Sequence, residues 1–229
     1  MSDANINTPS VLSYGDTVGP DGIWMQCLNR AQGTALRPAL FLDRDGVILV
    51  ETHYLHTVED TQLEAGAADC IRRANALGLP VVVVTNQSGI GRGIYGWAEF
   101  AAVQDKMLDD LAQEDAFVNA VMACPFHEGA EPPWNVPDHP DRKPQPGMLL
   151  RAGDLLPIDF GQSWIVGDHA SDLQAGKASG LAGGVHVWSG HGSHPGQRDN
   201  AWKTAGGGFK VLESDGIADA ADVLPLLSR

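Results

Sequence analysis

The feature that most constrains the fold is a run of four valines, Val81 to Val84, directly after Pro80. Valine is branched at Cβ, which makes its side chain stiff and favours a strand. A strand that is apolar at every position has both faces buried, as in a parallel sheet covered by helices on both sides. The run therefore predicts a buried parallel strand.

The rest of the chain alternates between strand and helix patterns. Apolar runs predict further strands at residues 39–42, 117–123, 163–166 and 184–188. Apolar residues at helical spacing predict helices at residues 65–78, 97–114, 147–155, 171–179 and 217–227. This alternation predicts an α/β fold, in which a mostly parallel sheet is the middle of three layers. Residues 189–208, rich in Gly, His and Ser, are predicted to be a surface loop.

The chain of 229 residues is predicted to form one domain over residues 38–229, preceded by a polar extension over residues 1–37. The extension has no basic start followed by an apolar run, and no stretch of the chain has the length of a membrane span. Three widely separated cysteines do not suggest a disulfide framework. A cytoplasmic location is therefore expected.

Four polar motifs follow the apolar runs or lie in the long loop between them. Ligands on open parallel sheets bind at the carboxyl ends of the strands, so these motifs are expected to meet at one site. The motifs are Asp43-Arg44-Asp45-Gly46, Thr85-Asn86-Gln87-Ser88-Gly89, Arg142-Lys143-Pro144 and Gly167-Asp168 with Asp172.

The chemistry of these motifs fits phosphoryl transfer. Asp43 can attack phosphorus and form an aspartyl-phosphate, and Asp45, on the same side of an extended chain, can act as general acid and base. Carboxylates around a phosphate require a divalent cation, and oxygen ligands select Mg²⁺. We expect Asp43, the backbone carbonyl of Asp45 and Asp168 to hold this ion. Lys143 and Thr85 are expected to contact the transferring phosphoryl group.

The four motifs together resemble those of the haloacid dehalogenase (HAD) superfamily of phosphatases, over residues 39–188. The resemblance implies a doubly wound, Rossmann-like three-layer sandwich without a large cap domain. It also implies the same roles: Asp43 as nucleophile, Asp45 as acid and base, Thr85 as phosphate ligand, Lys143 as charge stabiliser and Asp168 as metal ligand. Asp172 is expected to orient Lys143 or a metal-bound water. Further substrate contacts are expected from Asn86, Gln87, Ser88, Arg92 and Arg142.

Within this superfamily, the segments DRDG, TNQSGIGRG and RKPQPGMLL resemble one branch, which holds heptose bisphosphate and histidinol-phosphate phosphatases. The cations Arg92 and Arg142 favour a substrate with a second phosphate, so the expected partner is a small phosphorylated sugar. Histidinol phosphate, a 3′-phosphorylated DNA end and non-catalytic sugar-phosphate sensing stay open as alternatives. The net charge of −14 disfavours nucleic acids and anionic membranes. The oligomeric state is left open, with a monomer as one option.

The loop before Arg142 departs from that branch, which usually carries a structural zinc site of three cysteines and one histidine. The corresponding candidates here are Cys124, His127, His139 and Asp141. One thiolate in place of three makes a poor zinc site. The loop either binds a metal more weakly or is held without metal by the packing of Pro132, Pro133, Trp134 and Pro137.

Several histidines near these motifs have no assigned role. His53 and Tyr54 either fold over the substrate or lie on the surface. His169 follows Asp168 closely enough to approach the metal, whereas His191 and His194 are expected to be solvated.

Overall fold

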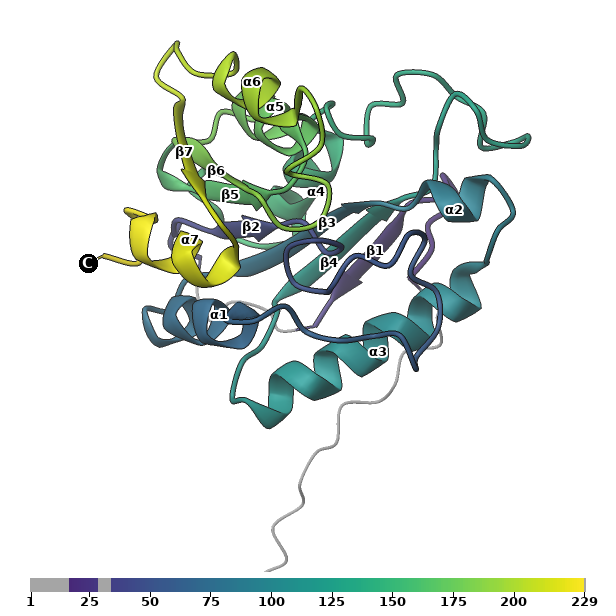
Figure 1. The fold of residues 1–229 in the computed structure, drawn as a ribbon, viewed down its shortest axis with the longest axis horizontal. Coiled ribbons are helices and arrows are strands. Elements are labelled where there is room, and N and C mark those ends of the chain that lie inside the picture. The colour runs from purple at the N-terminus through teal and green to yellow at the C-terminus, as the bar shows by residue number, and fades with distance from the viewer. Residues whose placement is uncertain (1–16, 29–33, 229) are drawn as a thin grey trace, which may run out of the picture.

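The computed structural model describes residues 17–28 and 34–228, and these form a central sheet between two layers of helices (Figure 1). The strands of the described chain form one seven-stranded sheet in the order β1-β4-β3-β2-β5-β6-β7. Strand β1 pairs antiparallel with β4, and the other neighbouring strands are parallel. The strands are β1 (Trp24–Cys27), β2 (Leu40–Leu42), β3 (Val81–Asn86), β4 (Ala120–Cys124), β5 (Trp164–Gly167), β6 (Gly183–Val187) and β7 (Lys210–Ser214).

The helices lie on both faces of this sheet, as the sequence predicts. Helices α1 (Ala67–Ala76), α3 (Trp97–Gln113) and α7 (Ile217–Val223) cover one face, and α4 (Gly147–Leu155), α5 (Ala170–Ala178) and α6 (Gln197–Trp202) cover the other (Figure 1). A short helix α2 (Ser88–Gly91) follows β3, and a 3-10 turn η2 (Phe160–Gln162) precedes β5. The doubly wound α/β fold is confirmed.

The valine run explains why the sheet has two cores. Side chains alternate between the faces of a strand, so Val81 and Val83 join one core, while Val82 and Val84 join the other. The first core includes Phe100 of α3, and the second includes Met148 of α4. Because both faces are covered by helices, the strand is apolar at every position.

Besides the short elements α2 and η2, three elements were not predicted. Trp24–Cys27, inside the expected extension of residues 1–37, form the edge strand β1, so this part of the extension belongs to the sheet. Lys210–Ser214 form the other edge strand, β7, and Gln197–Trp202 form helix α6 within the expected loop. Both edge strands carry polar residues, because an edge strand has a partner on one side only. No helix among the described residues is long and apolar enough to cross a membrane.

The fold brings the carboxyl ends of β2, β3 and β5 to one edge of the sheet. Strand β2 lies between β3 and β5, with Leu42 paired with Val83 and Val166. Between β2 and α1 the chain forms turns and isolated bridges, without a separate domain over the site. The motifs that follow the three strands are therefore neighbours around an open edge.

Candidate active site

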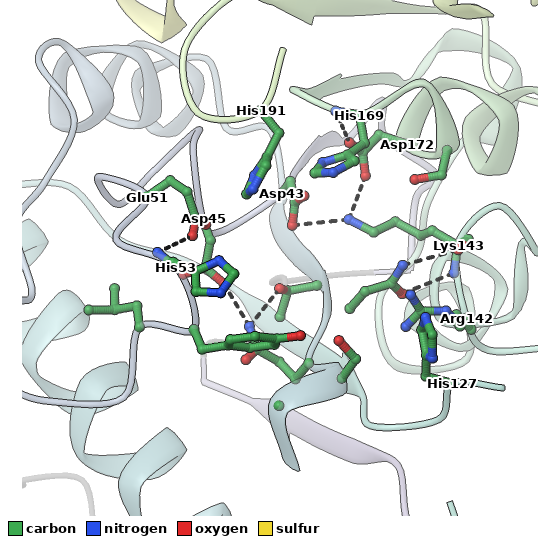
Figure 2. Close-up of a pocket in the computed structure, with 18 of the residues that line it drawn as sticks. Asp43, Asp45, Glu51, His53, His127, Arg142, Lys143, His169, Asp172 and His191 are labelled. Carbon is green, nitrogen blue, oxygen red and sulfur yellow. Dashed lines mark hydrogen bonds and ion pairs between the residues drawn. The ribbon is translucent and has the colours of Figure 1, made fainter. Parts of the chain in front are cut away.

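A cleft of about 500 Å³ lies at this edge and is lined by residues of all four motifs. Figure 2 shows Asp43 at its centre, with Lys143 and Asp172 on one side and Asp45 on the other. The volume lies in the range of small-molecule sites. The structure thus brings together Asp43, Asp45, Thr85, Lys143 and Asp172, and the wall also contains Asn86, Gln87, Ser88, Arg92 and Arg142.

Lys143 links the carboxylates of two motifs. Its Nζ lies 3.0 Å from Oδ1 of Asp43 and 2.5 Å from Oδ1 of Asp172, and it donates a hydrogen bond to the carbonyl of Val84. All three side chains are buried. Burial alone would lower the pKa of Lys143, but Asp172 and Asp43 raise it above its usual value. The ammonium is therefore charged and fixed beside Asp43.

Asp43 lies in an environment with an excess of negative charge. Burial raises its pKa to about 7, Lys143 opposes this rise, and the carboxylates of Asp172 and Asp168 add to it. The side chain still accepts a hydrogen bond of 2.7 Å from the backbone N–H of Arg44. A buried carboxylate held by its own loop and crowded by other carboxylates is a place where a cation is required.

Asp168, at the end of β5, is fully buried and held through both oxygens. Its Oδ1 lies 2.7 Å from Nδ1 of His169, and its Oδ2 accepts a hydrogen bond of 2.8 Å from the backbone N–H of His191. Burial opposes ionisation of Asp168, yet these hydrogen bonds hold its pKa below the usual range. Burial would lower the pKa of His169, but the hydrogen bond to Asp168 and the charge of that carboxylate raise it to about 9.

Two glycines make room for this carboxylate. Gly46 and Gly190 both have positive φ, 79° and 54°, and a Cβ on either would lie 2.5 Å from Oδ2 of Asp168. Only glycine combines this backbone conformation with so close an approach. The loop after β2 and the loop after β6 therefore close around Asp168.

The donor set fits Mg²⁺. Asp43, Asp168, His169 and Asp172 offer ligand atoms within 4.8 Å of one another, three of them carboxylate oxygens. Hard oxygen ligands are those that Mg²⁺ prefers. Burial, with a smaller effect of the neighbouring carboxylates, raises the pKa of Asp43, and a cation bound there would oppose both effects. The residues present would therefore suit the ion that the sequence predicts.

Asn86 and Gln87, expected to contact the substrate, are bonded to other residues of the site. The amide of Asn86 donates to the carbonyl of Lys143 at 3.0 Å and accepts from its N–H at 3.1 Å. Gln87 is buried, and its Nε2 donates to Oδ2 of Asp45 at 2.7 Å and to Oγ1 of Thr85 at 2.9 Å. These two amides hold other site residues. Of the three substrate contacts expected from this motif, only Ser88 has no side-chain partner among the described residues.

A second, cationic wall lies away from Asp43. An Nη of Arg92 donates to Nδ1 of His127 at 3.0 Å, and Arg142 donates to the carbonyl of Phe126 at 2.9 Å. Burial and the two arginines lower the pKa of His127, so its ring is neutral and accepts the bond. Arg92, His127 and Arg142 all line the cleft. The two arginines make this side of the cleft cationic.

Three side chains of the candidate second metal site have other partners in the folded chain. His127 is bonded to Arg92, the ring of His139 stacks on Phe126 at 3.8 Å, and the carboxylate of Asp141 accepts two hydrogen bonds from Arg151. Among the described residues, the clusters of potential ligands lie around Asp168 and do not include Cys124, His127, His139 or Asp141. The expectation of a site there is therefore not supported, because stacking and an ion pair use the side chains instead.

Several residues of the cleft lie beyond the sequence motifs. Glu51 and His53 line the side opposite Arg142 and His127 (Figure 2), and Tyr54 also lines the cleft. His53 and Tyr54 have positive φ, which is costly for residues with a Cβ and is commonest at functional sites. His191, expected to be solvated, contacts Asp168. His191 lies in a glycine-rich segment, and the sequence does not indicate that this segment turns back toward the site.

Comparison with known proteins gives the same family throughout. The sequence profile of HAD-hydrolase-like proteins matches residues 141–205. A relative in Mesorhizobium japonicum, named D-glycero-β-D-manno-heptose-1,7-bisphosphate 7-phosphatase, is 48% identical over 163 residues, which is 71% of this chain and 75% of the relative.

Two solved structures extend the likeness to the fold. A HAD-like phosphatase from Mesorhizobium loti has a TM-score of 0.78 and 42% identity, and the alignment covers 90% of this chain and 92% of that chain. A D,D-heptose 1,7-bisphosphate phosphatase from B. bronchiseptica, solved with magnesium and phosphate, has a TM-score of 0.65 and 30% identity. Its alignment covers 81% of this chain and 97% of that chain.

Proposed function

Because this chain belongs to the D-glycero-β-D-manno-heptose 1,7-bisphosphate 7-phosphatases, a family of HAD-like hydrolases, we propose that it removes the 7-phosphate from that sugar. The observation that carries the proposal is the pair Asp43 and Lys143, buried together at the centre of a cleft with a cationic wall. The names of the relatives favour a heptose bisphosphate over histidinol phosphate. No observation supports the DNA-end or sensor alternatives.

The first half of the reaction transfers the phosphoryl group to the protein. A carboxylate oxygen of Asp43 forms a bond to phosphorus as the bond from phosphorus to the sugar oxygen breaks. Asp45 gives its proton to the departing oxygen, so that an alcohol leaves in place of an alkoxide. Lys143, 3.0 Å from Asp43, and the hydroxyl of Thr85 offset the charge on the phosphoryl oxygens in this proposal.

The second half restores the free enzyme. Asp45, now a carboxylate, takes a proton from water as the water oxygen attacks phosphorus, and the aspartyl-phosphate bond breaks. Inorganic phosphate leaves and the Asp43 carboxylate is regenerated. When bound by Asp43, Asp168 and the backbone carbonyl of Asp45, Mg²⁺ would supply positive charge for both halves.

The cationic wall accounts for a bisphosphate substrate. With one phosphate at Asp43, Arg92 and Arg142 offer charged donors to the other, and the sugar lies between them beside Glu51 and Tyr54. Asn86 and Gln87 act indirectly, by holding Lys143 and Asp45.

The proposal is tested by incubating the protein and Mg²⁺ with heptose 1,7-bisphosphates of both anomers, fructose 1,6-bisphosphate and histidinol phosphate. Phosphorus NMR identifies which phosphate is lost. Loss of the 7-phosphate from the β-anomer at the highest kcat/KM supports the proposal, and preference for another substrate contradicts it. Mg²⁺ should also raise the unfolding temperature of the wild type but not of Asp168→Asn.

A further inference from the structure

Arg44 lies between the two catalytic aspartates but points away from the cleft. Alternate residues of an extended chain face opposite sides, so its side chain enters the core beneath the site. It is fully buried, and its guanidinium lies 4.8 Å from the ring centre of Phe100 on α3. An apolar side chain would suit this place, since burying a charge costs free energy. The presence of a guanidinium there calls for an explanation.

The guanidinium of Arg44 bonds the side chain of Asp45, the next residue in the chain. Its Nε donates to Oδ1 and its Nη2 donates to Oδ2, each at 3.1 Å, which makes a two-pronged contact with the whole carboxylate. Its Nη1 is buried and has no acceptor in the described part of the chain. The side-chain hydrogen bonds of Arg44 within that part therefore all go to Asp45. Such planar pairing fixes the orientation of a carboxylate as well as its position.

A second support reaches Asp45 from the segment at the end of β3. The hydroxyl of Tyr95 donates to Oε1 of Gln87, which turns the amide nitrogen of Gln87 toward Oδ2 of Asp45, 2.7 Å away. Burial raises the pKa of Tyr95, so its hydroxyl keeps the proton that it donates. The carboxylate is thus held between a guanidinium and an amide.

We propose that Arg44 is a positioning residue that holds the Asp45 carboxylate in line with the leaving oxygen of the substrate. This inference rests on the proposed phosphatase function, and it adds a role for a residue that touches neither substrate nor metal. General acid catalysis contributes about 10² to 10⁴ in rate and depends on placement of the acid to within a fraction of an ångström. Loss of Arg44 should therefore affect substrates according to how much their leaving group needs a proton.

The test compares two leaving groups in Arg44→Met. The leaving group of a sugar phosphate is a poor one, an alkoxide, unless it receives a proton. The leaving group of p-nitrophenyl phosphate is a stable phenolate, which departs without one. The value of kcat/KM reports the step in which the leaving group departs, before water attacks the phosphorus of the aspartyl-phosphate. We expect kcat/KM to fall at least about tenfold for the sugar bisphosphate and less than about threefold for the aryl phosphate.

Two further measurements separate positioning from a structural role. Arg44→Met leaves the Asp45 carboxylate without its cation, so the unfolding temperature should fall, and the kinetics are measured below the unfolding temperature of the variant. A loss of stability alone would lower kcat/KM equally for the two esters. Asp45→Asn should show a larger loss with the same leaving-group selectivity, and adding Arg44→Met to it should cause little further loss, because both act through one group. Arg44→Lys should restore part of the selective loss.

Tyr95→Phe tests the positioning of Asp45 through its second support, and it replaces Arg44→Met if that variant does not fold. It removes the donor that orients Gln87, and the selectivity should again shift toward the aryl phosphate. Equal losses on both substrates, or additive losses with Asp45→Asn, would overturn the inference. A wild type without activity on either ester would contradict the proposed function itself, whereas an active wild type with unselective variants would contradict only the role of Arg44.

Discussion

The ammonium group of Lys143 lies 3.0 Å from the carboxylate of Asp43, and both are buried. The two residues lie 100 positions apart in the chain. The pair is held in register because the amide of Asn86, at the end of β3, bonds the backbone of Lys143 on both sides. Asp43 and Lys143 are thus fixed to neighbouring strands of one sheet.

Replacing Lys143 by Met should lower kcat for a sugar bisphosphate by about 10² to 10³, as with the loss of a donor to a developing charge. Phosphate release measures the effect. Lys106→Met is the matched control, because Lys106 pairs with Asp110 on α3, outside the residues that line the cleft. An activity of Lys143→Met close to that of the control would remove Lys143 from the mechanism.

The stability of the metal-free protein should depend on pH through Asp43. Burial raises its folded pKa to about 7 from an ordinary value of 3.8. Between these values the folded chain keeps a proton that the unfolded chain loses, so the free energy of unfolding falls as the pH rises through this window. Asp43→Asn removes that titration. The unfolding temperature of the variant relative to the wild type should therefore increase from about pH 4 to about pH 8, and a constant difference would contradict the assignment.

Arg92→Gln should affect a bisphosphate more than a monophosphate. Loss of a charged hydrogen bond to the distal phosphate is expected to raise KM for the bisphosphate by about tenfold. Steady-state kinetics on the bisphosphate and on the sugar with only the 7-phosphate separate the two effects. The exposed Arg72 on α1 provides the control Arg72→Gln. The same rise in KM for both substrates would place the second phosphate elsewhere.

The loop that carries Arg142 and Lys143 should depend on Arg151 for its stability. Arg151 pairs with buried Asp141 at 2.7 Å and with Asp21, in the turn before β1, at 2.7 Å. Arg151→Met leaves the Asp141 carboxylate unpaired, so we expect the free energy of unfolding in urea to fall by about 1 to 3 kcal/mol. Arg72→Met, which breaks an exposed pair, should change it by less than about 0.5 kcal/mol. Similar values for the two variants would show that the Arg151 pair does not hold the loop.

The sequence predicts the centre of this protein better than its edges. Val81 to Val84 reveal a buried strand because every position is apolar, and the motifs after the central strands meet because parallel strands end at one edge. The edge strands β1 and β7 escape prediction because they are partly polar, whereas the equally short central strands are apolar throughout. Their pairing depends on contacts with residues far along the chain.

The candidate site shows a similar limit. The residue types of the four motifs predict a phosphoryl-transfer centre, but the partners of each side chain depend on the folded chain. No sequence pattern indicates that Tyr95 orients Gln87, or that Arg151 takes the carboxylate of Asp141 from a potential metal site. Motif spacing identifies the chemistry, whereas these supports depend on packing between distant segments.

The most direct test of the account is phosphate release from D-glycero-β-D-manno-heptose 1,7-bisphosphate by three samples. These are the wild type with Mg²⁺, the wild type after chelation, and Asp43→Asn with Mg²⁺. We predict rapid release of one phosphate by the first sample and a loss of at least about 10³ in rate in the other two. Release by Asp43→Asn at a rate near that of the wild type would contradict the central claim that Asp43 is the nucleophile.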